Sequence, residues 1–193
     1  MKISIIKEES YKISIWSGGQ TKELYIYPKE SSYAKRDFIF RISSATIEEE
    51  ESKFTALEGI NRFITTLNNE IMLKHNGLEK IYLKPYEVYK FSGSIGTESK
   101  GMAEDFNLMV KEGILSQMES IEIGQNFIEE SLNTRKTIIY SPISYLEIQI
   151  KDEEYRINKG EALFIDKENE ECFAKIKSGQ NHKNRAIICK IDI

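Results

Sequence analysis

Residues 38–46 read Phe-Ile-Phe-Arg-Ile-Ser-Ser-Ala-Thr, and this stretch indicates a β fold. Its large apolar side chains alternate with other residues, which is the period of two of a half-buried strand. If the two phenylalanines pack in the core, Arg41 and Ser43 face the opposite side of the strand, toward solvent or a polar cavity.

The same alternation recurs along the chain, at residues 3–5, 13–15, 121–123 and 146–150. Turn sequences separate these segments, among them Gly18-Gly19, Asn76-Gly77 and Ser178-Gly179. Helical signal is weak and predicts only a few turns, at residues 99–105 and 125–132. Many short strands at this spacing favour an all-β sandwich or barrel.

Residues 158–165, Asn-Lys-Gly-Glu-Ala-Leu-Phe-Ile, resemble the cupin pattern in which a glycine turn leads into a buried strand. We therefore expect two stacked cupin-like (RmlC-like) β-barrels or sandwiches with few short helices. No low-complexity linker divides residues 1–193, so we treat them as one unit. A seam near residue 112 gives two provisional lobes, a barrel over 1–112 that carries the pocket motifs and a second barrel over 113–193.

Composition and charge argue against a nucleic-acid-binding, membrane or secreted protein. The chain has 193 residues with 27 basic and 31 acidic side chains, a net charge of −4, and no basic block, which argues against nucleic-acid or anionic-membrane partners. No apolar run approaches a membrane span, and charge at Lys7 and Glu8 interrupts the start too early for a signal peptide. Cys172 and Cys189 are expected to be reduced core thiols, so we expect a cytoplasmic protein.

Histidine usage argues against metal and triad chemistry. His75 abuts the Asn76-Gly77 turn and His182 lies in a polar run, so we expect both to be exposed. Two such histidines do not make a cupin metal site or a Ser-His-Asp triad. We therefore predict no metal, no cofactor and no catalytic residue. The glycine-rich segment 92–96 fits no phosphate-binding loop and is expected to be flexible.

Polar residues embedded in apolar strands are the main functional signal. Arg41 and Ser43 share one side of a strand, and Asp105 and Asn107 share one side of another, while Arg62 begins a third. A desolvated arginine needs an anionic partner. Two interpretations stay open: an internal ion pair such as Arg41–Asp105, or a polar cavity whose arginines bind a carboxylate ligand.

These segments also resemble the HutD/Ves family. Residues 16–23, Trp-Ser-Gly-Gly-Gln-Thr-Lys-Glu, are similar to its GGxTxE motif, and residues 41–45 to its RxSxA strand. Phe54-Thr55 is similar to its phenylalanine-serine segment, and residues 57–62 are similar to the glycine-to-arginine stretch that follows. Phe91-Ser92-Gly93 resembles its phenylalanine-x-glycine site, and residues 105–109 resemble its DxNxM motif. Glu48–Glu51 departs from the family by replacing a loop that usually contains glycine. We read this run as a solvated loop tip that changes the charge at the pocket mouth.

The resemblance implies a metal-free bicupin. One family member is encoded with histidine-utilization enzymes and is thought to limit that pathway by binding an intermediate such as a formylated glutamate or urocanate. The arginines would hold the ligand's carboxylate, and the hydroxyl and amide side chains would orient its amide or formyl group. The implied pocket residues are Trp16, Thr21, Glu23, Arg41, Ser43, Arg62, Asp105 and Asn107.

We expect a non-catalytic cupin that senses or sequesters a small carboxylate-bearing metabolite and has a regulatory role. One alternative is a metal-free isomerase or hydrolase with Glu23 or Asp105 as general base. The other is a scaffold whose polar residues form internal ion pairs without a ligand. Core packing is an equal alternative for Trp16 and is favoured for Phe54 and Phe91. A homodimer, for example through strand pairing of residues 1–7, stays open.

Overall fold

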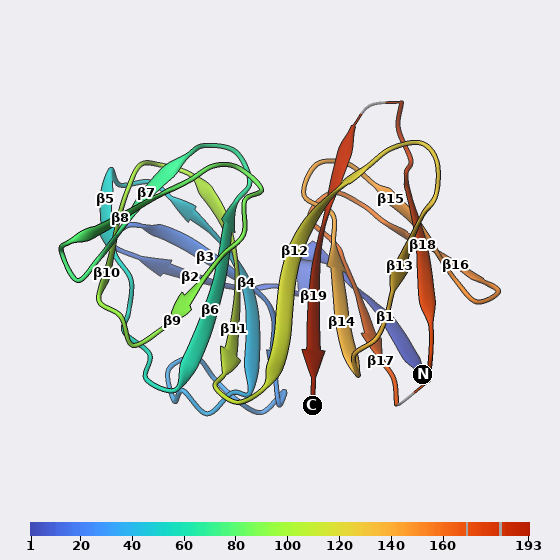
Figure 1. Ribbon diagram of the computed structural model, residues 1–193, viewed down its shortest axis with the longest axis horizontal. Coiled ribbons are helices and arrows are strands. Elements are labelled where there is room, and N and C mark those ends of the chain that lie inside the picture. The colour runs from blue at the N-terminus through green and yellow to red at the C-terminus, as the bar shows by residue number, and fades with distance from the viewer. Residues whose placement is uncertain (169, 182) are drawn as a thin grey trace. The chain divides into compact units, whose positions relative to one another are not determined.

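The structure, a computed structural model, describes residues 1–168, 170–181 and 183–193 (Figure 1). The described residues are nearly all β, and their one helical segment is a single 3₁₀ turn at Glu8–Ser10. Two compact units are formed, one by residues 11–113 and the other by residues 1–10 with 114–193. No helix among the described residues is long and apolar enough to cross a membrane.

The unit of residues 11–113 contains a six-stranded and a four-stranded antiparallel sheet. The six-stranded sheet has the order β2 (Lys12–Trp16), β3 (Gly19–Tyr27), β4 (Phe40–Ile47), β11 (Glu104–Lys111), β6 (Ile60–Thr66) and β9 (Tyr89–Ser92). The four-stranded sheet has the order β5 (Glu51–Lys53), β10 (Thr97–Lys100), β7 (Ile71–His75) and β8 (Glu79–Leu83). Side chains of both sheets, such as Ile64 and Leu73, form one buried core cluster.

The other unit also contains two antiparallel sheets. Its five-stranded sheet has the order β1 (Lys2–Ile6), β17 (Ala162–Asp166), β14 (Lys136–Tyr140), β19 (Asn184–Asp192) and β12 (Leu115–Ile123). Its four-stranded sheet has the order β13 (Ile128–Ser131), β18 (Phe173–Ser178), β15 (Leu146–Ile150) and β16 (Glu153–Ile157). Isoleucines of both sheets, including Ile148 and Ile188, meet in its core.

Two expectations about the chain's organisation need correction, and one about its cysteines is confirmed. Residues 1–10 do not belong with the lobe predicted over 1–112, because β1 pairs with β17 along its whole length. The helical turns predicted at 99–105 and 125–132 are wrong, because parts of these segments lie in β10, β11 and β13. Their backbone N–H and C=O groups form hydrogen bonds with adjacent strands instead of within a helix. Cys172 and Cys189 are buried free thiols, as predicted.

Candidate functional site

A cavity of about 470 Å³ lies in the unit of residues 11–113 and gathers most of the predicted site residues. Seven of the eight line it, namely Trp16, Thr21, Arg41, Ser43, Arg62, Asp105 and Asn107. The eighth, Glu23, is not part of the lining but forms an ion pair with Arg41. Residues spread over more than ninety sequence positions therefore meet at one place.

Strand register explains why these residues meet. Because side chains alternate between the two faces of a strand, every second residue of β4 and β11 points to the same face. The antiparallel register then aligns these residues in rows across the sheet. The rows are Thr21–Ala45–Asp105, Glu23–Ser43–Asn107 and Arg41–Met109–Arg62.

Arg41 is held by neighbours on its own side of the sheet. Its Nε donates to Oε2 of Glu23 at 2.6 Å, and its Nη1 donates to Oγ of Ser43 at 3.1 Å. Its guanidinium also lies 4.5 Å from the centre of the Tyr33 ring. The internal ion pair suggested from the sequence joined Arg41 to Asp105, and this pairing is wrong. The partner is Glu23, because the strand register puts Glu23 opposite Ser43, two residues from Arg41, whereas Asp105 lies opposite Ala45, four residues from Arg41.

Arg62 is buried with its hydrogen-bonding capacity only partly used. Its side chain is 6% exposed, and its guanidinium lies 4.6 Å from the Phe54 ring centre and 5.6 Å from that of Phe91. Nη2 donates to Oδ1 of Asn107 at 3.4 Å, whereas Nε is buried with no hydrogen-bond partner. Burial lowers the pKa of Arg62, while Tyr33 and Asp105 oppose that shift. A buried donor without a partner costs about 1–3 kcal/mol, so this group is ready to bind an acceptor.

Asp105 is the second unusual charge in the cavity. It is 3% exposed and accepts a 2.6 Å hydrogen bond from Nδ2 of Asn107. Burial raises its pKa from 3.8 to about 7, against the opposing effects of Arg62, the Asn107 hydrogen bond and the backbone N–H of Ala45. None of the ion pairs within 4.0 Å among the described residues joins Asp105 to Arg62. The carboxyl group is therefore close to half-protonated at neutral pH.

Trp16 forms part of the cavity wall at the end of β2. Its Nε1 donates to Oγ1 of Thr21 at 3.2 Å. The ring lies so close to Gly18 that a Cβ there would be 2.1 Å from a ring carbon. The Trp16 ring can therefore take this position only because residue 18, in the β2–β3 turn, is a glycine.

Gly19 gives a testable prediction about this turn. Its φ is +144°, and an added Cβ would lie 1.9 Å from the carbonyl oxygen of Thr46. Since backbone cannot move aside as a side-chain end can, we expect Gly19→Ala to lower the free energy of unfolding by at least about 2 kcal/mol. Gly124→Ala is the matched control, because nothing lies within 4 Å of its added Cβ. Equal unfolding midpoints in urea for the two variants would contradict the prediction.

Two sequence expectations around the cavity are wrong. His75 is not exposed but only 4% accessible, because as the last residue of β7 it points inward and its ring nitrogens bond to Thr97 and Tyr89 at 2.9 and 3.1 Å. Burial lowers its pKa. Segment 92–96 is not a free loop, since Gly93 exchanges backbone hydrogen bonds with Leu57 and Ile60. His182 lies outside the described residues.

Sequence reasoning missed some cavity residues. Tyr33 lies in the irregular connection between β3 and β4, where no periodicity marks its role. Phe54 packs partly against the core, as favoured, but it also covers Arg62 and lines the cavity. Its place in the family motif was the signal that could have revealed this second role.

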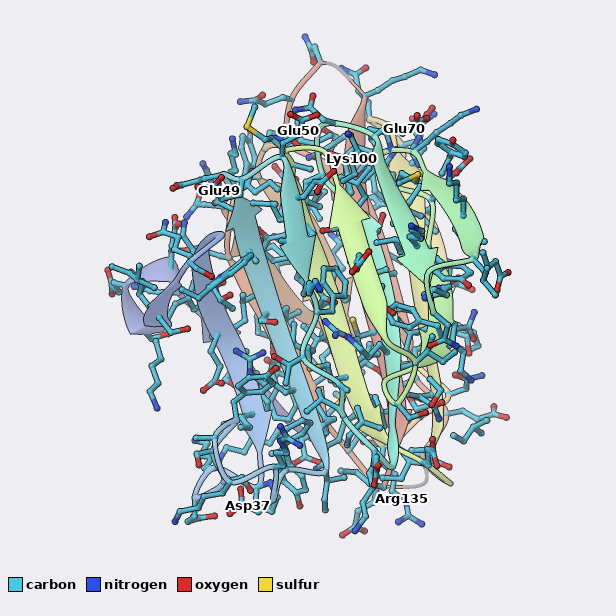
Figure 2. All side chains as sticks on the ribbon, turned by 90° about the vertical axis from the view of Figure 1, so that its left-hand side faces the viewer. Asp37, Glu49, Glu50, Glu70, Lys100 and Arg135 are labelled. Carbon is cyan, nitrogen blue, oxygen red and sulfur yellow. The ribbon has the colours of Figure 1, made fainter. Side chains whose placement is uncertain are left out.

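The acidic run Glu48–Glu51 does not act only as a solvated loop tip. Glu50 and Glu51 pair with Lys100 at 3.5 and 3.4 Å, and Glu51 lies in β5. Figure 2 shows Glu49, Glu50, Lys100 and Glu70 near one end of the unit of residues 11–113. A second groove of about 840 Å³ is lined by Glu49 and Glu51 and shares Trp16, Ser17 and Lys53 with the cavity.

Metal binding has no clear candidate here. Among residues 1–168, 170–181 and 183–193, no group of three or more histidine, cysteine, aspartate or glutamate side chains is placed to hold a metal ion. The polar groups of the cavity are two arginines, one carboxyl group with a raised pKa, hydroxyls and an amide. This set suits hydrogen bonding to an anionic or amide-bearing ligand.

Comparison with known proteins supports a cupin-like fold. The protein PA5104 of unknown function from Pseudomonas aeruginosa is 16% identical, with a TM-score of 0.89 and full coverage of both chains. HutD from Pseudomonas fluorescens, determined in a formate condition, is 19% identical with a TM-score of 0.78, over 99% of this chain and 98% of that one. YlbA from Escherichia coli is 12% identical with a TM-score of 0.67, over 98% and 90%. No curated protein matches the sequence significantly.

The family assignment rests on sequence. The HutD family profile matches residues 8–182, which covers most of the chain and all the motifs quoted above. The nearly all-β architecture agrees with the structural comparison. The chain therefore belongs to the HutD family and has a cupin-like, nearly all-β fold.

Proposed function

We propose that this protein binds a small carboxylate-bearing metabolite in the cavity of residues 11–113 and does not convert it. The observation that carries the proposal is Arg62, whose buried Nε has no hydrogen-bond partner while its side chain lines the cavity. A carboxylate oxygen would satisfy that donor and form a charge-assisted hydrogen bond. A cavity of about 470 Å³ is within the usual range for small-molecule sites.

The two arginines have different roles in this proposal. Arg41 is already paired with Glu23, so its role in the proposal is to shape the cavity wall rather than to neutralise the ligand. Arg62 is the arginine that gains a partner when the ligand binds. Ser43, Thr21 and Asn107 supply neutral hydrogen-bonding groups that would orient the rest of the ligand.

Membership of the HutD family sets the biological part of the proposal. We propose a sensing or sequestering role in the cytoplasm, with an intermediate of histidine degradation as the leading ligand class. The proposal treats each two-sheet unit as a cupin-like barrel, with the ligand inside the barrel of residues 11–113. Formate enters the test because it is the smallest carboxylate and because the P. fluorescens HutD structure was determined in a formate condition.

The test is a thermal-shift and calorimetric screen of the purified protein. The panel holds formate, urocanate, glutamate, N-formylglutamate, histidine and the uncharged amides of the same compounds. A ligand at 100 times its dissociation constant adds about 2.7 kcal/mol, which for a chain of this size raises the melting temperature by roughly 5–10 °C.

Arg62→Met is expected to weaken binding of the selected carboxylate by at least about 100-fold, because it removes the charge-assisted hydrogen bonds. Arg135→Met, at a half-exposed arginine in the other unit, is the control and is expected to bind normally. A carboxylate that binds Arg62→Met as tightly as the wild type would overturn the proposal.

A second candidate function has one specific observation in its favour. The pKa of Asp105 near 7 is suited to general acid–base catalysis at neutral pH. NMR time courses with each bound compound distinguish the two functions. Turnover that is lost in Asp105→Asn while binding persists favours an enzyme, whereas an unchanged ligand favours simple binding.

A further inference from the structure

Strand β2 is an exposed edge of the six-stranded sheet. It pairs with β3 on one side and ends the strand order on the other. Ile13 and Ile15 are 59% and 86% exposed, although isoleucine is among the residues most often buried. Exposed apolar edge strands are templates for pairing with another chain, and proteins usually protect them.

Five of the other seven terminal strands carry such protection, whereas β1 has only the charge of Lys2 and β9 only that of Lys90. The five bear paired or adjacent charged side chains, namely Glu51 and Lys53 on β5, Glu79 and Lys80 on β8, Glu119 and Glu122 on β12, Glu129 and Glu130 on β13, and Glu153 and Glu154 on β16. The central part of β2, Ile13-Ser14-Ile15, has no charge. The contrast indicates that β2 is an interface rather than a surface that faces water.

A comparison within the chain strengthens this point. Residues 2–5 and 12–15 have the same sequence, Lys-Ile-Ser-Ile, and both lie in terminal strands. In β1, however, Ile3 packs against the core of its own unit and Ile5 is only 38% exposed. The isoleucines of β2 have no comparable burial, so the same motif is left for an outside partner.

The sequence of β2 is complementary to itself. When two identical strands pair antiparallel about a two-fold axis, that axis passes between the strands, midway between one residue and its own copy on the opposite strand. Centring the pair on Ser14 puts Ile13 opposite Ile15 of the partner subunit, so that all four isoleucines meet. Centring it on Ile13 or Ile15 would leave isoleucines unpaired. The same register keeps the two Lys12 ammonium groups apart, because Lys12 then faces the end of the other strand.

We propose that two copies of this chain form a symmetric dimer by antiparallel pairing of β2, centred on Ser14. The strand addition joins the two six-stranded sheets into one continuous sheet. Ser14 and Ile15 also line the cavity, so the second copy would lie at its rim. The dimer itself does not depend on the proposed ligand.

The first test measures the molar mass of the full chain by light scattering or sedimentation at protein concentrations from about 1 µM to about 1 mM. This range covers dimers with dissociation constants from micromolar to millimolar. We expect a concentration-dependent dimer that Ile15→Lys weakens at least about tenfold, because it removes apolar contact and places two charges in the interface. Leu78→Lys is the control, since Leu78 is 87% exposed outside β2. Unchanged melting of both variants verifies their folding.

The second test fixes the register. Ser14→Cys is expected to cross-link to itself under mild oxidation, because opposing Cα atoms in a strand pair are within disulfide range. Ser4→Cys, at the matching position of β1, is expected to stay monomeric, and the native thiols are buried. A monomer at every concentration would overturn the proposal. So would a dimer unaffected by Ile15→Lys, or one that cross-links through Ser4→Cys and not through Ser14→Cys.

Discussion

Replacing Glu23 with alanine is expected to lower the free energy of unfolding by about 3–5 kcal/mol, the usual cost of leaving a buried charge without its partner. The ion pair joins Glu23 to Arg41 at 2.6 Å, and their side chains are only 14% and 5% exposed. Arg41→Ala is expected to cost a similar amount, because it strands the Glu23 carboxylate. Urea unfolding followed by circular dichroism measures both.

Two further variants make this test specific. The double variant Glu23→Leu/Arg41→Met removes both charges and is expected to be more stable than either single variant. Glu122→Ala breaks exposed ion pairs with Lys183 and Arg185 and is expected to leave the free energy of unfolding nearly unchanged. If Glu23→Ala were as mild as Glu122→Ala, the Glu23–Arg41 pair would have no structural role.

This result bears on the scaffold alternative. An internal ion pair without a ligand describes Arg41 well, since its Nε donates to Glu23 and its Nη1 to Ser43. It does not describe Arg62, whose buried Nε has no hydrogen-bond partner and whose ion pair to Asp105 is not formed within 4.0 Å. The scaffold interpretation therefore accounts for Arg41 and does not account for Arg62.

The alternation within single strands was the part of the site that sequence could predict. Arg41 with Ser43 and Asp105 with Asn107 each share a face because the strand period is two, whatever the neighbouring strands are. This local rule placed the polar groups together on the correct faces. The family motifs then added Trp16, Thr21 and Glu23 from a separate part of the chain.

The alternation within one strand does not predict which strands lie side by side or in what register. Glu23 rather than Asp105 binds Arg41 because the register of β3 and β11 on β4 brings Glu23 two residues, and Asp105 four residues, from Arg41. His75 was misread because an Asn-Gly turn follows it, although the strand period alone points it inward. Residues 1–10 join β17, which is more than 150 positions away. Such contacts depend on the whole topology, and a short window of sequence does not contain that information.

Asp105→Asn is expected to make the protein more stable than the wild type at neutral and higher pH. The folded pKa of Asp105 is about 7, against 3.8 ordinarily, since burial disfavours the charged form. Below pH 3.8 the group is protonated in both states and contributes nothing. Between 3.8 and about 7 the unfolded state ionises first, so stability falls as pH rises, by about 4 kcal/mol in all. Urea unfolding of both proteins from pH 4 to pH 9 measures this difference, with the exposed Asp152→Asn as control.

Ligand binding should follow the same titration. A carboxylate held by Arg62 lies near Asp105, so ionisation of Asp105 opposes binding, and the bound ligand in turn raises the pKa of Asp105. The affinity is therefore expected to fall by up to about tenfold per pH unit above about 7. Asp105→Asn should bind with a nearly flat profile over that range, because its side chain does not ionise. Calorimetry at pH 6, 7 and 8 tests both proteins, and parallel profiles would show that Asp105 does not face the ligand.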